Sequence, residues 1–394
     1  MKILLVHIGS IYKYPPVLSA LRAMSKLDAE LVFIGTDIGE QTRKMCEKLS
    51  IKPMSIHANY EKTIHPLFKM FRMQSIKKAL WARIQIEYDT NTVIWVFSDL
   101  ALKHLGKKLL KFNYVLHMFE LAQKTLYYRK VPFLKINTGK YARRAIAVAQ
   151  AEYNRAQICR AWWGLNYLPY VIPNKPFYNI KLDRKSGIDN VQARKIINSL
   201  EEKKIILYQG HVAKERPLDP FLDAINTLGS DFALVIMSGS ETAREYQKFK
   251  NTVVIPFIEP PYHLQVTSHA YIGLLSYVPT KNEYSVLNSI YCAPNKLYEY
   301  SQFGIPMIGN DIPGLRYTIE ENKMGICLNE FSGSSVVTAI NRIESDYEAF
   351  SENASNFNER TDLVAIYSSI FSDLKKYLGE DKDRTIRIGT LHEK

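Results

Sequence analysis

The segment Pro294–Gly304 brings together residue types that can bind a nucleotide. Lys296 and Glu299 are three residues apart, and Asn295 and Glu299 are four apart. A proline can begin a helix and a glycine can end one, so the segment predicts a short helix with these side chains on one side. The carboxylate can accept hydrogen bonds from both hydroxyls of a ribose, and the lysine can meet a diphosphate. The alternative is an exposed Lys–Glu pair, which contributes only about 0.3–0.5 kcal/mol.

Two earlier turns contain residues that suit a phosphate. Gly210 ends an apolar run, and Arg216 and Pro217 follow at the predicted start of a helix. The glycine lets the backbone approach a ligand, and an arginine beside a helix start offers bidentate hydrogen bonds to a phosphate. Gly239, in a second turn of small residues, leaves room for backbone N–H groups to face a phosphate. Neither turn has a GxGxxG or P-loop lysine pattern, so ordinary strand-to-helix loops are the alternative.

The N-terminal half also contains residues that could take part in a reaction. Gly9 and Ser10 follow the first apolar run, Asp99 follows a second, and His117 and Glu120 follow a third. We expect His117 to contact the reacting group and Glu120 to orient it or take a proton, with Asp99 as the other candidate carboxylate. The alternative is a structural histidine, because a lone histidine is more often structural than catalytic.

Short apolar runs alternate with longer amphipathic stretches, and these runs must position the candidate residues. The alternation is typical of βαβ units around a parallel sheet, and ligands bind beyond the carboxyl ends of such strands. It restarts after a polar interval at residues 181–190, which predicts two consecutive α/β domains. The predicted strands are Lys2–Val6, Leu31–Ile34, Thr92–Phe97, Tyr114–His117, Ile146–Ala149, Lys204–Tyr208, Phe232–Met237, Thr252–Pro256, Tyr271–Leu275, Ile305–Ile308 and Ile326–Leu328.

These patterns set the predicted domain boundaries. We expect an N-terminal domain over residues 1–178 and a C-terminal domain over residues 190–360. A helix over residues 361–378 can cross back to the N-terminal domain, and residues 379–394 form a charged tail. A chain of 394 residues is too long for one comfortable hydrophobic core, which also favours two domains.

Charge is distributed unequally between the two halves. Residues 1–175 contain 28 lysines and arginines against 11 acidic residues, a balance of +17, whereas residues 176–394 contain 24 against 28, a balance of −4. Such an asymmetry indicates that the N-terminal half faces a polyanion, such as a phospholipid surface, a lipid-linked diphosphate or nucleic acid. The alternative is a basic face that serves only solubility. A nucleic-acid-binding protein needs a groove-reading element or a basic stacking sheet, and the sequence indicates neither.

The segment Pro66–Arg83 contains cations and aromatic residues without a single acidic residue. A basic helix of this kind can lie at a membrane interface, where each cation near anionic lipid contributes about 1 kcal/mol. The alternative, equally favoured, is a helix packed on the N-terminal sheet. The cations assigned to an anionic surface are Lys69, Arg72, Lys77 and Lys78.

Other features limit the location of the protein. The four cysteines have neither metal-ligand nor CxxC spacing, so we expect no disulfide and no structural zinc. The first apolar run is too short for a signal peptide, and no run approaches the roughly 18 apolar residues of a membrane-spanning helix. We therefore expect a cytoplasmic protein that can associate peripherally with the inner face of the plasma membrane.

Three segments resemble the GT-B glycosyltransferases of the "group one" family, a type found in bacterial polysaccharide and glycan assembly. The sequence from Pro294 to Ile308 resembles their donor-site helix and the strand after it, and residues 207–217 and 169–176 resemble their glycine loop and the segment before the interdomain linker. The resemblance implies two facing Rossmann-like, doubly wound domains with the active site in the cleft between them. The N-terminal domain then binds the acceptor, with Gly9 and Ser10 on the acceptor side, and the C-terminal domain binds the nucleotide-sugar donor. It also implies that Glu299 binds the nucleotide ribose and that Gly210 and Arg216 face the diphosphate. Tyr291 stands where the family often has a second glutamate.

The resemblance implies a transferase that moves a hexosyl group from a UDP- or GDP-sugar to a hydroxyl of a glycan or lipid-linked acceptor. Protein cations and helix N-terminal amides can meet the charge of the departing diphosphate, so we expect no metal and no cofactor. The alternatives are a sugar-nucleotide epimerase or hydrolase on the same scaffold and, from a different class, a basic nucleic-acid-binding protein.

Overall fold

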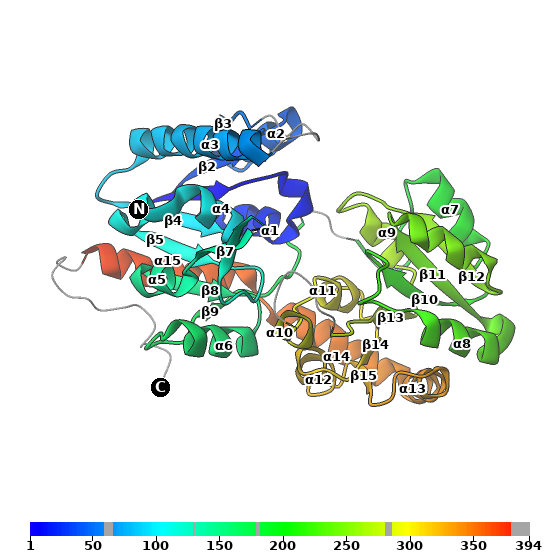
Figure 1. The fold of residues 1–394 in the computed structure, drawn as a ribbon. Coiled ribbons are helices and arrows are strands. Elements are labelled where there is room, and N and C mark those ends of the chain that lie inside the picture. The colour runs from blue at the N-terminus through cyan, green and yellow to red at the C-terminus, as the bar shows by residue number, and fades with distance from the viewer. Residues whose placement is uncertain (59–65, 129–130, 179–181, 280–285, 380–394) are drawn as a thin grey trace. The chain divides into compact units, whose positions relative to one another are not determined.

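The structure is a computed structural model that describes the chain except residues 59–65, 129–130, 179–181, 280–285 and 380–394. The described residues divide into two compact units. The first comprises Met1–Phe177 and the segment from Asp362 to Gly379, and the second lies between Tyr178 and Thr361. Both units are built around a parallel sheet with helices on its faces (Figure 1).

The first unit contains a seven-stranded parallel sheet in the order β3-β2-β1-β4-β5-β8-β9. Its strands are β1 (Lys2–His7), β2 (Glu30–Thr36), β3 (Lys52–Ile56), β4 (Thr92–Phe97), β5 (Tyr114–His117), β8 (Ala147–Gln150) and β9 (Tyr170–Val171). The antiparallel pair β6 (Thr125–Tyr128) and β7 (Val131–Ile136) lies outside this sheet. The helices before the C-terminal segment are η1 (Ile11–Lys13), α1 (Pro15–Met24), α2 (Glu40–Lys48), α3 (Pro66–Glu87), α4 (Ser98–Leu105), η2 (Gly106–Lys111), α5 (Thr138–Arg144) and α6 (Tyr153–Trp163).

The second unit contains a six-stranded parallel sheet in the order β12-β11-β10-β13-β14-β15. Its strands are β10 (Lys204–Gln209), β11 (Phe232–Ser238), β12 (Thr252–Pro256), β13 (Ile272–Leu275), β14 (Met307–Asn310) and β15 (Gly325–Leu328). Its helices are α7 (Val191–Asn198), α8 (Asp219–Leu228), η3 (Gly229–Asp231), η4 (Glu241–Lys248), α9 (His263–Thr267), α10 (Leu287–Ile290), α11 (Lys296–Ser301), α12 (Pro313–Ile319), α13 (Gly333–Ser345) and α14 (Tyr347–Arg360).

Both sheets follow the doubly wound pattern, in which the first strand of the unit lies beside the fourth. The reversals of strand order fall between β1 and β4 in the first sheet and between β10 and β13 in the second. In β10, Ile205 and Leu207 pack into one core while Ile206 and Tyr208 pack into another, so the strand is buried on both faces. Ligands of doubly wound sheets bind at the carboxyl ends of strands beside such reversals.

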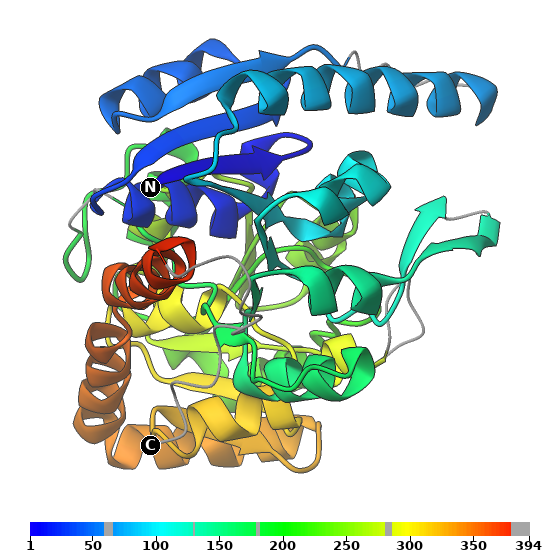
Figure 2. The same ribbon diagram turned by 90° about the vertical axis from the view of Figure 1, so that its left-hand side faces the viewer.

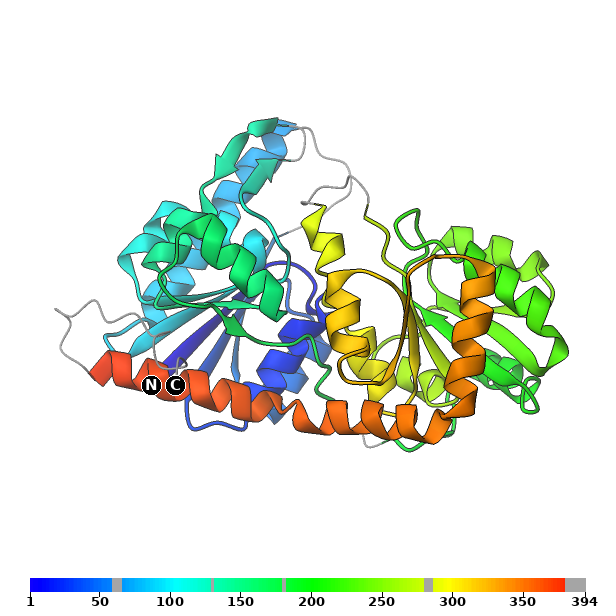
Figure 3. The same ribbon diagram turned by 90° about the horizontal axis from the view of Figure 1, so that it is seen from below.

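The last helix, α15 (Leu363–Gly379), belongs to the core of the first unit (Figure 3). Tyr367 and Phe371 are buried against Trp95 of β4, with ring centroids 5.8 and 6.3 Å from that of Trp95. Asp373 accepts a 2.7 Å hydrogen bond from the Tyr170 hydroxyl. The first unit is therefore assembled from both ends of the chain.

The fold class predicted from the apolar runs is confirmed: each unit is a doubly wound, parallel α/β structure. Thr92–Phe97, Tyr114–His117 and Thr252–Pro256 form strands with the predicted bounds. The prediction omitted four strands, two of which, β3 and β9, lie at the edges of the first sheet.

Candidate functional site

Helix α11 is fixed against the second sheet by Tyr300. The Tyr300 side chain is completely buried, and its hydroxyl donates a 3.0 Å hydrogen bond to the Leu207 carbonyl of β10. Gly273 of β13 makes this packing possible, because a Cβ at that position would lie 2.4 Å from the Tyr300 ring. On the same helix Lys296 and Glu299 are only 9% and 7% exposed. The alternative of an exposed Lys–Glu pair is therefore wrong.

The Glu299 carboxylate is held by groups from β10 and α9. Gln209 Nε2 donates a 2.5 Å hydrogen bond to Glu299 Oε2, and His263 Nε2 lies 3.3 Å from Oε1. The Thr267 hydroxyl donates to Gln209 Oε1 at 2.7 Å, which fixes the orientation of the amide. Burial alone would raise the pKa of Glu299, but His263, Lys296 and Gln209 together hold it below its usual value. The carboxylate is therefore ionised at neutral pH.

Lys296 lies against the glycine turn that follows β10. Gly210 has φ +126°, and a Cβ on it would lie 3.0 Å from Lys296 Nζ. The amine donates a 3.1 Å hydrogen bond to the Tyr277 hydroxyl and lies 5.5 Å from the ring centroid of Tyr208. Burial and, to a smaller extent, the charge of Arg216 lower the pKa of Lys296 to about 7, although the charge of Glu299 opposes the shift. This amine can gain a proton when an anion approaches.

Arg216 is a second cation beside the same turn. Its guanidinium carbon lies 5.3 Å from the Tyr277 ring centroid, and its Nε is buried without a hydrogen-bond partner among the described residues. Tyr277 is itself anchored to the end of β14, because its N–H donates to Asn310 Oδ1 at 2.8 Å. Lys296, Arg216 and Gly210 thus surround one place beside the reversal between β10 and β13.

The two glycine turns of the second unit are joined to each other. Ser240 Oγ lies 2.7 Å from His211 Nδ1 and accepts a 3.0 Å hydrogen bond from the Val212 N–H. A Cβ at Gly239 would lie 3.1 Å from Phe257, whose side chain is 62% exposed. Asn295 is the N-terminal cap of α11, is partly buried and makes no side-chain capping bond.

The six residues predicted on the donor side all lie in loops or helices at this end of the second sheet. Sequence analysis did not identify Gln209, His263, Thr267 and Tyr277, which hold them. Gln209 had a signal, since it is a polar residue that ends an apolar run directly before Gly210. His263, fully 36 residues from Glu299, had none.

The acceptor-side candidates of the first unit lie at the carboxyl ends of β1, β4 and β5. His117 is 1% exposed, packs against Phe97 and Phe119, and accepts a 3.4 Å hydrogen bond at Nδ1 from Trp95 Nε1. Its Nε2 has no hydrogen-bond partner within the described structure, and burial lowers the pKa of His117 to about 3. His117 is therefore neutral at physiological pH and surrounded by aromatic rings.

Asp99 and Glu120 lie near a residue that sequence analysis did not identify. Tyr14 has a raised pKa because it is partly buried and because the charges of Asp99 and Glu120 act on it. Asp99 is in the first turn of α4 and lies 3.8 Å from Lys103 one turn later. The ring of Tyr14 contacts His7 of β1, with centroids 4.8 Å apart. The two carboxylates and the tyrosine hydroxyl thus lie close enough to influence one another.

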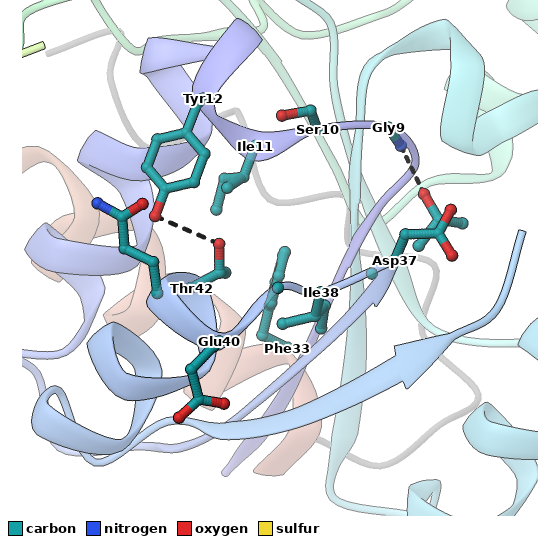
Figure 4. Close-up of a pocket in the computed structure, with 13 residues that line it drawn as sticks. Gly9, Ser10, Ile11, Tyr12, Phe33, Asp37, Ile38, Glu40 and Thr42 are labelled. Carbon is teal, nitrogen blue, oxygen red and sulfur yellow. Dashed lines mark hydrogen bonds between the residues drawn. The ribbon is translucent and has the colours of Figure 1, made fainter. Parts of the chain in front are cut away.

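Gly9 and Ser10 line a pocket of about 360 Å³ at the carboxyl ends of β1 and β2. All residues that line it belong to the first unit. Gly9 has φ +103°, and its N–H donates a 2.8 Å hydrogen bond to Thr36 Oγ1. The two sequence candidates thus lie at a cavity, which Figure 4 shows.

Helix α3 lies along the strands β2 and β3 of the first sheet (Figure 2). Its C-terminal half is packed: Ile76, Leu80 and Ile84 are buried, and Trp81 donates a 3.0 Å hydrogen bond to the Leu105 carbonyl. Trp81, one of the aromatic residues of Pro66–Arg83, is therefore packed within the first unit.

The lysines and arginines of α3 that were assigned to an anionic surface differ in their exposure to solvent. Phe71 is 66% exposed and Lys78 is exposed, whereas Arg72 and Lys77 are partly buried. The side chain of Lys69 lies outside the described structure. Across the described parts of the chain, no helix combines the length and the apolar character needed to cross a bilayer.

Neither a protein-family model nor a curated protein matches the sequence. Solved structures do match over nearly the whole chain. Sucrose-phosphate synthase from Thermosynechococcus elongatus is 16% identical with a TM-score of 0.66, and the match covers 96% of this chain and 99% of that one. Anabaena Alr3699/HepE, solved with UDP and glucose, is 14% identical with a TM-score of 0.65, covering 95% and 99%.

A putative UDP-N-acetylglucosamine 2-epimerase from Listeria monocytogenes is 14% identical with a TM-score of 0.57, and the match covers 98% of this chain and 99% of that one. Identities this low show a shared fold. The expectation of a GT-B-type fold is therefore confirmed, and the chain has two Rossmann-like units of this type.

Proposed function

We propose that this protein is a glycosyltransferase that moves a hexosyl group from a UDP- or GDP-sugar to a hydroxyl of a glycan or lipid-linked acceptor. One observation carries the proposal: a buried lysine lies against the glycine turn after β10, with a buried, ionised carboxylate one turn along the same helix. The fold supports it, since one protein of the same fold was solved with UDP and glucose.

In this proposal Glu299 accepts hydrogen bonds from the ribose hydroxyls, and Lys296 and Arg216 bind the diphosphate. Transfer breaks the bond between the sugar and the diphosphate, so negative charge grows on the departing nucleotide. The Lys296 amine gains a proton most readily when that charge lies beside it, because its pKa of about 7 is close to neutrality. Arg216 stays protonated at any physiological pH.

The acceptor hydroxyl must lose a proton as it attacks. Asp99 and Glu120, close enough to act on the pKa of Tyr14, are the proposed proton acceptors. His117 is proposed as a neutral contact for the sugar rather than as an acid or base, because protonating it requires a pH near 3.

The test is a panel of UDP- and GDP-sugars incubated with the full chain, with and without glycan acceptors. Nucleotide release that depends on both a sugar nucleotide and an acceptor supports the proposal. Activity should survive EDTA, because protein cations are proposed to meet the charge of the diphosphate. Abolition by EDTA with rescue by Mn²⁺ contradicts metal independence.

An epimerase is the second candidate, because a putative 2-epimerase shares the fold. An epimerase interconverts UDP-sugars in the absence of any acceptor, whereas a transferase yields a glycosylated product. Product analysis by mass and anomeric coupling therefore separates the two.

We also propose that a lipid-linked acceptor is met at the cytoplasmic face of a membrane through the exposed part of α3. Lys78 and Phe71 are exposed there, in a half of the chain with a charge balance of +17. Binding to anionic vesicles should fall steeply with salt, because the attraction is screened within a Debye length. Replacing Lys69, Arg72, Lys77 and Lys78 with glutamine should reduce sedimentation with vesicles and leave UDP binding unchanged.

A further inference from the structure

The pocket at the carboxyl ends of β1 and β2 differs in charge from the unit that contains it. It is formed by the turn Gly9–Tyr12 on one side and by Asp37–Thr42, where α2 begins, on the other (Figure 4). Its volume of about 360 Å³ is at the lower end of the range of roughly 300–1,000 Å³ found for small-molecule sites. None of the residues that line it is a lysine, arginine or histidine, although this half of the chain has an excess of 17 cations.

The polar lining consists of hydrogen-bonding groups without positive charge. Asp37 and Glu40 contribute carboxylates, Gln41 an amide, and a group of serine, threonine and tyrosine side chains contributes hydroxyls. Thr36 is 4% exposed and its oxygen accepts the Gly9 N–H, so its hydroxyl hydrogen is left for another acceptor. No described residue takes that hydrogen. A buried donor that faces a cavity is a group that a ligand can satisfy.

Asp37 is held in place while part of its carboxylate stays accessible. The residue has φ +48°, and its Oδ1 accepts a 2.9 Å hydrogen bond from the Ala58 N–H and lies 3.4 Å from His57 Nδ1. In the described structure its Oδ2 makes no hydrogen bond. Glu40 has only an ion pair of 3.4 Å with Lys44, and both of these side chains are about 70% exposed. Solvent screens such a pair, so Glu40 can accept hydrogen bonds from a ligand.

The remaining surface of the pocket is apolar. Phe33, which is 1% exposed, and Ile38 lie at the back, and the ring of Tyr12 lies at the side, where it is 37% exposed (Figure 4). The Thr42 hydroxyl lies 3.4 Å from the Tyr12 hydroxyl, which fixes the ring. An exposed aromatic ring among hydroxyls and carboxylates matches a sugar ring, which has C–H groups on its faces and hydroxyls at its edge.

We propose that this pocket binds a sugar ring of the acceptor that carries no negative charge, either a neutral sugar or an amino sugar. The inference rests on the proposed glycosyl transfer and names the acceptor class for it. Two carboxylates with no cation among the lining residues repel a phosphate, sulfate or uronate group and attract an ammonium group. The diphosphate of a nucleotide is disfavoured for the same reason, because none of the lining residues is a cation that could neutralise it.

The test uses the full chain and four small probes: methyl glucoside, methyl 2-amino-2-deoxyglucoside, glucose 6-phosphate and glucuronate. Ligand-observed NMR ranks their affinities, and hydrogen–deuterium exchange locates the binding. The neutral and amino glycosides should bind at least tenfold more tightly than the two anions, and should protect peptides that contain Gly9–Tyr12 and Asp37–Thr42. Equal binding of the anions, or protection elsewhere, overturns the proposal.

The variants Asp37→Asn and Glu40→Gln remove charge without changing shape. Asparagine tolerates a positive φ and keeps the oxygen that accepts the Ala58 N–H, and Glu40 is exposed, so both variants should fold. Each variant should bind the amino glycoside about tenfold more weakly than the parent does. The difference in affinity between the amino glycoside and glucose 6-phosphate should therefore become smaller. Glu47→Gln, an exposed residue of the same helix outside the pocket, is the matched control and should change neither. An effect of Glu47→Gln as large as that of the others means that general charge, not the pocket, selects the sugar.

UDP binding measured on the same samples separates this proposal from the proposed function. If UDP binds but no glycoside does, the pocket proposal fails and the donor site stands. If the glycosides bind with the expected selectivity while no nucleotide sugar is used, the pocket stands and the transferase proposal fails.

Discussion

The first unit belongs to the half of the chain that is rich in cations, yet aromatic rings, neutral histidines and carboxylates lie at the carboxyl ends of its strands, here called the first edge. The second unit belongs to the half with a slight excess of acids, yet a buried lysine and an arginine lie at the carboxyl ends of its strands, the second edge. At the second edge each charged group is held by polar or aromatic side chains: Lys296 and Arg216 share Tyr277, and Glu299 is held by Gln209 and His263. At the first edge His7 and His117 have buried nitrogens without described partners.

This difference shows that net charge does not predict the charge of a site. Surface cations lie in solvent and act over long range, whereas a few buried groups determine what a site binds. In the proposed function the second edge binds an anion, and in the further inference the first edge binds a sugar without negative charge. Four predictions test that contrast.

The largest expected effect is on the anion site. Lys296→Met should weaken UDP binding by about 3 kcal/mol, because it removes a charged hydrogen bond to the diphosphate in a buried place. Uridine, which has no phosphate, should bind equally well to the variant and the parent in calorimetry. The fold should tolerate methionine, since an apolar side chain replaces a buried amine. Lys214→Met, which changes an exposed lysine of the loop after β10, is the control. A similar loss for uridine would show that Lys296 supports the turn and not the phosphate.

Glu299→Ala should weaken both UDP and uridine by roughly 1.5–3 kcal/mol, because both contain the ribose hydroxyls that the carboxylate is proposed to accept. Glu299→Gln should lose less, since it keeps one oxygen acceptor. Calorimetry with 2′-deoxyuridine completes the test, because a ligand that lacks one hydroxyl should lose less from the mutation. Unchanged uridine binding in Glu299→Ala would remove Glu299 from the ribose site.

The third prediction concerns the neutral histidines of the first edge, which should make the stability of the protein depend on pH. Burial lowers the pKa of His7 to about 4, so between about pH 6.5 and pH 4 the unfolded chain binds a proton that the folded chain does not. Stability is therefore lost as the pH falls through this window. Urea titrations should show that His7→Leu reduces the loss between pH 7 and pH 5 by roughly 1–2 kcal/mol. His57→Gln, whose side chain is 87% exposed, is the control. If the stability of His7→Leu depends on pH in the same way as that of the parent, the His7 side chain is hydrated in the folded protein.

The smallest expected effect is at the second edge, where Lys296 should take up a proton when UDP binds. Because the pKa of Lys296 is about 7, its amine is partly neutral above neutrality, and a bound diphosphate raises that pKa again. Calorimetry at pH 8 in buffers of different ionisation enthalpy should show uptake of up to about one proton in the parent and much less in Lys296→Met. The same shift makes stability rise with pH from about 7 to the unfolded value of about 10.5, by at most about 1.4 kcal/mol per pH unit. Proton release on binding would contradict the assignment.

The sheets and the helix that contains Lys296 and Glu299 could be predicted from the sequence, because their signals are local. Strand β4 is a continuous apolar run, and α11 follows a proline. Edge strands gave weaker signals: β3 contains Pro53, which a central strand rarely accepts, and β9 has only two residues.

The contacts of the site could not be predicted, because they join residues distant in sequence. The burial of His117 depends on Trp95 and Phe119, and the orientation of Glu299 depends on His263. The pocket beside Gly9 is completed by residues that follow β2, which are distant from Gly9 in the sequence. Its acidic lining also contrasts with the basic composition of the half of the chain that contains it. The composition of the N-terminal half indicated an anionic partner. Only the placement of the side chains shows that the lining of the cavity suits a sugar.

The helix α15 also has a consequence for how the protein is made. Leu363, Tyr367, Ile370, Phe371 and Leu374 complete the apolar core of the first unit, yet the ribosome adds them after the whole second unit. Domains generally fold as units while the chain grows, so the second unit can close its core first, although it begins later in the sequence. Until residue 374 emerges, the nascent N-terminal half keeps open the apolar surface against which these side chains pack. A fragment that stops at Phe177 would expose that surface permanently.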